Sequence, residues 1–199
     1  KNQASRFPGR GANVRRLDHV NYLSSHVAED VRVLESVLGG RRTEQIVADD
    51  GTPTAVWFSV TDKTYDLVTT VDRTGSSGRL HHVAFATDTR EDIPRAADVC
   101  LDSGIRIETG PHKHAIQQTF FLYVLEPGGN RIELCNAGAR LLLAPDWTVI
   151  SWTAEERARL RDRVVGGARD VARATGGFLG LGSKISDAEA QVLAKVEAA

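Results

Sequence analysis

Three side chains of the sequence have the types that bind a divalent transition metal. His19, His82 and Glu133 each lie in a segment where polar and apolar residues alternate, the pattern of a β-strand. Side chains of a strand alternate between its two faces, so three separate strands could point these groups into one cup. Two imidazoles and one carboxylate suit non-haem Fe(II), and they leave coordination positions open for a substrate and O2.

Alternation also predicts which neighbours share a face with the three residues. Asn21 is expected beside His19, whereas His81 is expected to point away from His82. Taken one at a time, each residue has a plainer explanation. A strand histidine is commonly a satisfied polar residue, and a strand glutamate is commonly a solvated charge. The argument for a metal therefore depends on the whole set and on the surrounding segments.

The elements that would position these residues occur in a repeated order. A strand, a helix and three strands are expected first in one half of the chain and then in the other. Two such βαβββ units would pair into a half-closed mixed β-barrel of the α+β class, whose concave face is a pocket. The first unit is expected at 16–24, 28–40, 41–49, 53–60 and 64–70, and the second at 79–86, 90–101, 105–109, 119–125 and 130–135.

The two ends differ in character from the 16–152 domain. Residues 1–15 are polar and basic and suggest a linker or arm. Residues 153–199 are rich in Ala, Arg and Glu, and two capping-box patterns, Thr153 to Glu156 and Ser186 to Glu189, predict two helices there. We expect this helical tail to lie outside the barrel and to pack on the domain or on a partner chain.

The composition is that of an ordinary globular chain and excludes several function classes. The 199 residues are 41% hydrophobic and 26% charged, with a net charge of −1, so we expect no general attraction to nucleic acid or to anionic membranes. No apolar run reaches the roughly 20 residues that span a bilayer. The only cysteines, Cys100 and Cys135, lie far apart, which argues against a disulfide framework and favours a cytoplasmic location.

A wider pattern surrounds the three residues. It runs through LDHVNYL, RLHHVAFAT, GPHKHAIQQTFFLYVLEPGGNRIELC and PDWTVISWT. These segments resemble the extradiol catechol dioxygenases of the vicinal oxygen chelate (glyoxalase-like) superfamily over residues 16–153. In the last third, the family pattern is matched by Gly110, Pro111, His114, Tyr123, Glu126, Pro127, Gly129, Arg131 and Glu133.

The resemblance implies a role for each matching residue. His19, His82 and Glu133 correspond to the metal ligands, and this ligand set admits Fe(II) and also Mn(II). His114 and Tyr123 correspond to groups that hydrogen-bond the bound catechol and oxygen. Three further residues are expected to line the substrate pocket: Asn21, Trp57 and Phe121.

The sequence departs from the family at Tyr65. Many members carry a histidine there, which acts as acid and base in O2 activation. A phenol with its ordinary pKa of about 10 is a poor base at neutral pH, although it is a good hydrogen-bond donor. Either Tyr65 performs a reduced version of this step or His114 takes over the proton transfer, and slow turnover or altered substrate choice would follow.

A second departure concerns the extent of the chain. Two-domain members carry an N-terminal copy of the barrel before the catalytic one, and this sequence shows one copy. Its tail beyond Trp152 does not match the usual C-terminal end of the family. All three ligand segments are present, so we expect a complete site.

The implied activity is that of an Fe(II)-dependent catechol 2,3-dioxygenase of aromatic hydrocarbon catabolism. Its substrates would be a catecholic small molecule and O2, and its product a 2-hydroxymuconic-semialdehyde type of compound. The resemblance also leads us to expect a homo-oligomer.

Two other functions on the same fold remain open. A metal-independent protein could bind an aromatic ligand or a drug, but the presence of all three ligands argues against it. A glyoxalase-type isomerase would generally need a fourth protein ligand. Cys135 is the residue to consider for that position, and a small buried apolar role suits it better.

Overall fold

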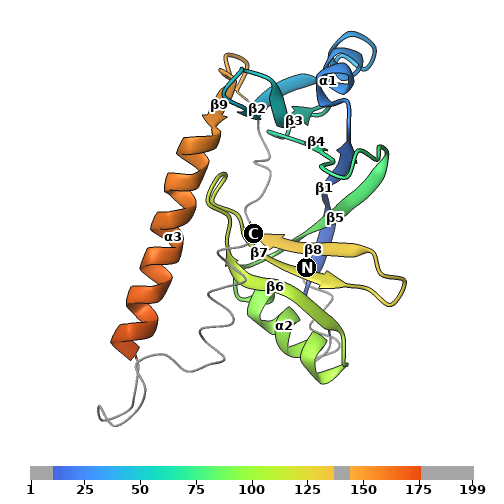
Figure 1. Cartoon of the computed structure of the whole chain (residues 1–199). Coiled ribbons are helices and arrows are strands. Elements are labelled where there is room, and N and C mark those ends of the chain that lie inside the picture. The colour runs from blue at the N-terminus through green and yellow to red at the C-terminus, as the bar shows by residue number, and fades with distance from the viewer. Residues whose placement is uncertain (1–10, 137–143, 176–199) are drawn as a thin grey trace. The chain divides into compact units, whose positions relative to one another are not determined.

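The computed structural model describes residues 11–136 and 144–175. The chain divides into two units, Lys1–Ala154 and Glu155–Ala199. The first unit contains all the strands of the described residues together with helices α1 and α2, shown in Figure 1. The long helix α3 (Ala154–Thr175) extends into the second unit.

Two βαβββ modules build the first unit, as the sequence predicts. The first comprises β1 (Val14–Ser24), α1 (Val27–Ser36), β2 (Arg41–Val47), β3 (Pro53–Ser59) and β4 (Leu67–Val71). The second comprises β5 (Arg79–Thr87), α2 (Asp92–Asp102), β6 (Arg106–Lys113), β7 (Phe120–Leu125) and β8 (Arg131–Asn136).

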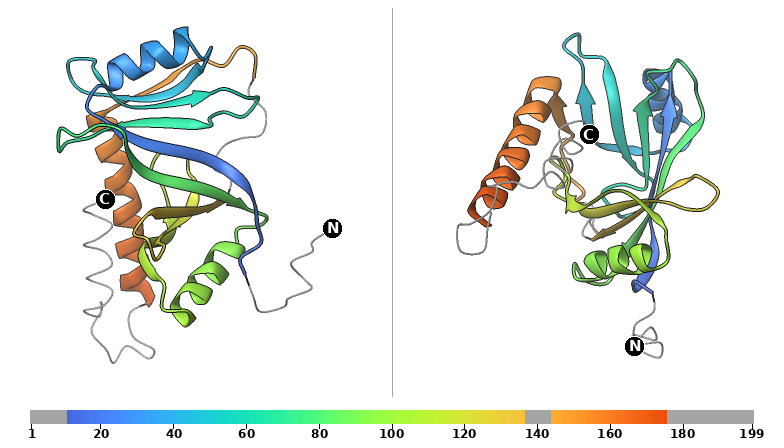
Figure 2. Two further views of the ribbon diagram at one scale, coloured as in Figure 1. Left: turned by 90° about the vertical axis from the view of Figure 1, so that its right-hand side faces the viewer. Right: turned by 60° about the horizontal axis from the view of Figure 1, so that its bottom comes forward.

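The strand order of the sheet shows how the modules join. It runs β6-β7-β8-β5-β1-β4-β3-β2-β9. In each module the first strand pairs in parallel with the last, β1 with β4 and β5 with β8, and the antiparallel β1–β5 pair joins the two halves. Figure 2 shows the resulting curved, open sheet. The prediction of paired modules in a half-closed mixed barrel is confirmed.

Each helix covers one half of the outer face of the sheet. Val31 and Leu34 of α1 pack with Val56 and Phe58 of β3, and the buried residues of α2 pack in the same way on β7. Strand alternation then turns the intervening side chains to the opposite face. That face carries Trp57 and Tyr65 in one module and Phe121 and Tyr123 in the other.

Two irregularities interrupt the β1–β5 ladder next to the histidines. On β1, Asp18 is an extra residue between the pairs Leu17–Phe85 and His19–Ala84. On β5, His81 is an extra residue, because Asn21 pairs with His82 and the next residue of β1 pairs with Leu80. Bulges of this kind re-aim side chains, and here they break the alternation that the sequence analysis assumed.

The ends of the domain differ from expectation in detail. Strand β1 begins at Val14, inside the expected linker 1–15, whose first ten residues lie outside the described part. A ninth strand, β9 (Ile150–Thr153), pairs in parallel with β2 and was not predicted. The first tail helix is present as α3, and the second expected helix lies outside the described residues. Within the described residues, no helix is long and apolar enough to cross a membrane.

Candidate metal centre

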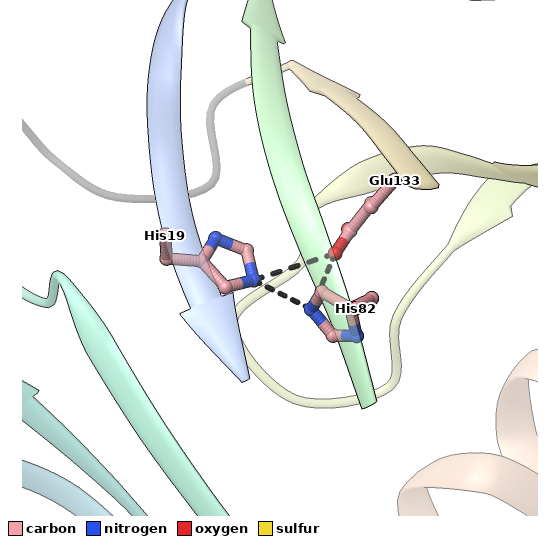
Figure 3. A group of neighbouring side chains, drawn as sticks. All are labelled: His19, His82 and Glu133. Atoms are coloured by element: carbon pink, nitrogen blue, oxygen red, sulfur yellow. Dashed lines mark hydrogen bonds and ion pairs between the residues drawn. The ribbon is translucent and has the colours of Figure 1, made fainter. Parts of the chain in front are cut away.

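Three strands bring His19, His82 and Glu133 together on the inner face of the sheet, as Figure 3 shows. The Nε2 atoms of the two histidines lie 2.9 Å apart. The Oε2 atom of Glu133 lies 3.4 Å from Nε2 of His19 and 3.1 Å from Nε2 of His82. The structure therefore gathers the three predicted ligands around one point.

These separations fit one side of an octahedral ion. With metal–ligand bonds of about 2.1 Å, two ligands at a right angle lie about 3.0 Å apart. All three pairs in the centre, at 2.9, 3.1 and 3.4 Å, are close to this value. An ion held by all three residues would have them on one side and would keep its other positions for exogenous ligands, as in the facial arrangement of non-haem iron sites.

The burial of Glu133 independently favours a cation at this point. Its side chain is 1% exposed, and neither carboxylate oxygen makes a hydrogen bond among the described residues. A buried carboxylate without such partners is costly unless a positive charge accompanies it. A divalent ion shared with the two imidazoles would supply that charge, so the residues fit a metal.

Asp18 orients the first histidine. Its carboxylate is buried, and Oδ1 lies 3.0 Å from Nδ1 of His19. The Nδ1–H group can thus donate to Asp18, which turns the Nε2 lone pair toward the centre. Arg16 and the ammonium group of Lys63 hold Asp18 in turn, at 2.8 Å from its carboxylate and 2.6 Å from its backbone carbonyl.

His81 contacts the second histidine, contrary to the prediction that it points away. Its Nδ1 lies 2.6 Å from Nδ1 of His82, because the bulge on β5 turns both side chains to the same side. Burial, His82 and the nearby Arg131 lower the pKa of His81 to about 3. Through this contact His81 holds the ring of His82, whose Nε2 is directed at Glu133.

The charges of the three central groups are strongly coupled. Burial alone would raise the pKa of Glu133, but the facing imidazoles of His114, His19 and His82 hold it well below its usual value. Burial would lower the pKa of His19, but Asp18 and Glu133 raise it to about 9. Burial lowers the pKa of His82.

His114 and Tyr123 lie next to the centre, on the side of the β6–β7 loop. Nε2 of His114 is 3.5 Å from Oε1 of Glu133 and 3.5 Å from the hydroxyl of Tyr123. The ring of Phe121 stacks on His114 at 3.6 Å and 4°. The sequence around His114 indicates no apolar partner for its ring, and the structure shows that Phe121 is one. Two polar groups thus face the position where a ligand of the ion would lie.

The remaining predicted residues line the other module. Tyr65 is buried, with its ring 4.9 Å from that of His19, and it packs in one cluster with Trp57. Burial, Asp18 and Glu133 hold the pKa of Tyr65 well above its usual value. Asn21 is buried and accepts a hydrogen bond of 3.0 Å from Thr70.

Cys135 takes no part in the ligand cluster. It is fully buried and packs with Ala84 and Phe121, and burial raises the pKa of its thiol. This environment agrees with the apolar role expected for it.

Sequence reasoning missed Asp18 and His81 as supports of the two histidines. One signal for Asp18 was present, since metal-binding histidines commonly donate their other ring N–H to a carboxylate and Asp18 directly precedes His19. No comparable signal existed for His81, because strand alternation pointed to the wrong face.

Comparisons with known proteins agree with this geometry. Residues 16–134 match the family described as Glyoxalase/Bleomycin resistance protein/Dioxygenase superfamily. The chain is similar to the manganese-dependent 2,3-dihydroxybiphenyl 1,2-dioxygenase of Geobacillus genomosp. 3, with 40% identity over 75% of this chain and 48% of the relative. It is also similar to the metapyrocatechase of Geobacillus stearothermophilus, with 36% identity over 78% of this chain and 47% of the relative.

The fold leads to the same group of proteins. The crystal structure of homoprotocatechuate 2,3-dioxygenase from Arthrobacter globiformis superposes with a TM-score of 0.68 and 32% identity, over 79% of this chain and 49% of that one. The chain spans about half the length of the curated relatives that it matches. With more than half of its length matched to one family, and with the same fold, the chain belongs to the glyoxalase/bleomycin resistance protein/dioxygenase superfamily.

Proposed function

We propose that this chain forms the catalytic barrel of an extradiol dioxygenase, which uses O2 to open a catechol-type ring beside its two hydroxyls. The observation that carries the proposal is the set of three ligand atoms 2.9–3.4 Å apart on the inner face. A facial set leaves adjacent positions for two exogenous ligands, and this reaction needs two, the catechol and O2. The activities named for the similar proteins belong to the same class.

We infer that His19, His82 and Glu133 hold Fe(II), with Mn(II) as the alternative. The ligand set suits both ions, and one similar protein is described as manganese-dependent. When bound, such an ion supplies Lewis acidity toward the catechol oxygens and a route for electrons to O2.

We infer that the remaining residues bind and orient the substrate. His114 and Tyr123, whose polar atoms lie 3.5 Å apart, would hydrogen-bond the catechol and oxygen. Phe121 would fix the plane of the His114 ring through their stacking contact. On the other side, Tyr65 next to His19 would donate a hydrogen bond, and Trp57 and Asn21 would form the pocket wall.

The test is a ring-cleavage assay on protein loaded with Fe(II) or with Mn(II). We expect one O2 to be consumed for each catechol, with a yellow ring-opened product, and no reaction for the metal-free protein or for His82→Ala. Catechol binding without a metal and without O2 uptake would instead support the binding-protein alternative. A cytoplasmic location and a homo-oligomeric state stay predictions from the sequence.

A further inference from the structure

A buried carboxylate outside the metal centre joins three segments of the first unit. Glu44 of β2 is 7% exposed. Its Oε1 accepts a hydrogen bond of 2.6 Å from the indole N–H of Trp152, and its Oε2 accepts one of 3.1 Å from the side-chain amide of Gln117. One side chain thus connects β2, the β6–β7 loop and β9.

The loop that Glu44 holds also carries His114. Its ends are joined by the bond from the His114 N–H to the carbonyl of Thr119, at 2.9 Å. Between them, Gln117 and Gln118 both have φ of +60°, a conformation that residues with a Cβ rarely adopt. Such a conformation persists only where surrounding contacts stabilise it, and the hydrogen bond from Gln117 to Glu44 is one of these contacts.

The other bond of Glu44 supports the pocket wall. Trp152 packs against the cluster that contains Ile46, Trp57 and Tyr65, and Tyr65 contacts His19. The indole N–H has to be satisfied when the ring is packed in this way, and Glu44 accepts it. Glu44 therefore supports the wall on the His19 side and the loop on the His114 side together.

We propose that Glu44 is a positioning residue. By holding Gln117 and Trp152, it fixes the loop that places His114 beside Glu133. For its effect on turnover the proposal rests on the dioxygenase function above. The positioning itself is a property of the loop and is measured without substrate or metal.

Hydrogen exchange measures the positioning directly. In Glu44→Gln, the amide can accept from one of its two partners, but its own NH2 group faces the other donor. We expect exchange in peptides covering 114–119 to rise about 10–100-fold, the range expected when one hydrogen bond to a charged group is lost. The control is Gln45→Ala, which removes a 2.9 Å bond from the neighbouring residue of β2 to Ser151 of β9, and which should leave exchange at 114–119 unchanged.

A polarity swap separates positioning from general damage. Gln117→Glu alone sets two carboxylates against each other and should release the loop while keeping the Trp152 bond. In Glu44→Gln/Gln117→Glu, the new amide accepts from Trp152 and donates to the new carboxylate. Slow exchange at 114–119 should then return. If the double variant exchanges as fast as the single ones, or if Glu44→Gln exchanges like wild type, the proposal is wrong.

Kinetics provide the second readout. In the metal-loaded enzyme, Glu44→Gln should lower kcat about tenfold with unchanged metal content, and the double variant should recover most of the loss. An inactive wild type would overturn the proposed function, and the exchange data would still decide the role of Glu44. Unchanged kcat with altered exchange would overturn the link from the loop to His114.

Discussion

His19 and Glu133 lie on strands that do not pair with each other, yet both are in register with one residue, Ala84 of β5. Ala84 is completely buried, and it lies two residues beyond His82 on the same strand. Ala84 thus lies between His19 and Glu133 across the sheet. We expect a larger side chain at this position to crowd both of them.

We predict that Ala84→Val abolishes metal binding while the fold persists. The added methyl groups should cost about 1–3 kcal/mol of stability, as overpacking usually does, and should also push the His19 and Glu133 side chains apart. The control is Ala96→Val in α2, which overpacks a similarly buried position on the outer face of the sheet. Metal content after loading and the thermal midpoint are measured for both. Full metal binding by Ala84→Val would show that the ligands tolerate the added volume.

Replacing either of the two adjacent histidines of β5 should weaken metal binding, but to different extents. His82→Ala removes a ligand and should eliminate metal binding. The sequence alone predicts that His81 points away from His82, in which case His81→Ala would keep its metal. The 2.6 Å contact between the two rings adds that affinity should fall by about 10–100-fold, the usual effect of losing a group that orients a ligand. Titration with Mn(II) or anaerobic Fe(II) gives both affinities, and wild-type affinity in His81→Ala would contradict the orienting role.

Much of the fold was predictable because each half of the chain satisfies the same local rules. Alternation in β3 sends Val56 and Phe58 to α1 and sends Trp57 to the inner face, as the pattern indicates. Strand β9 escaped prediction for a physical reason. It has four residues, three of them exposed, and its place is set by pairing with β2 across a long sequence distance.

The site was predictable as far as strand alternation and family resemblance extend. They predicted that His19, His82 and Glu133 converge and that His114 and Tyr123 lie beside them, and the structure brings these five residues together. They failed at Asp18 and His81, which are the extra residues of two bulges. A bulge depends on the pairing of two distant strands, so one strand's sequence does not reveal it.

We predict that His114→Asn keeps the metal but lowers kcat about 10²–10⁴-fold. This is the usual effect of losing a general acid or base. The residue lies beside Glu133 without belonging to the ligand cluster. Phe121→Leu is the companion variant, because it removes the ring stacked on His114 and should cause a smaller loss. Oxygen uptake at saturating catechol measures both, and an unchanged rate in His114→Asn would exclude it from the reaction.

Tyr65 offers a gain-of-function prediction. Its hydroxyl is buried beside His19, and burial and nearby carboxylates keep it protonated, so it can donate a hydrogen bond but not act as a base. Tyr65→His should raise turnover by introducing a group that both accepts and donates a proton at neutral pH. Tyr65→Phe should lower turnover with metal content unchanged. Stopped-flow measurements of catechol oxidation compare wild type with the two variants. Equal rates in all three would show that Tyr65 has no role in the reaction with O2.

The turn before β5 should make stability depend on pH in a defined direction. The Asp72 side chain is 1% exposed, and it accepts hydrogen bonds of 2.8 and 2.9 Å from Arg79 and of 2.6 and 2.9 Å from Thr74. Arg79 first, and then Thr74, hold the pKa of Asp72 well below its usual value. A carboxyl whose pKa is lower in the folded state stabilises the fold above its unfolded pKa of about 3.9 and loses that contribution as the pH falls below it.

Asp72→Asn should therefore unfold more readily than wild type at pH 7, and the difference should shrink as the pH falls below about 4. Arg79→Gln should show the same convergence, since it removes the other half of the fork that joins the two side chains. Urea unfolding between pH 3 and pH 7 measures both. A constant difference across this range would mean that hydrogen bonding alone, without the charge of Asp72, holds the turn that leads into the strand of His82.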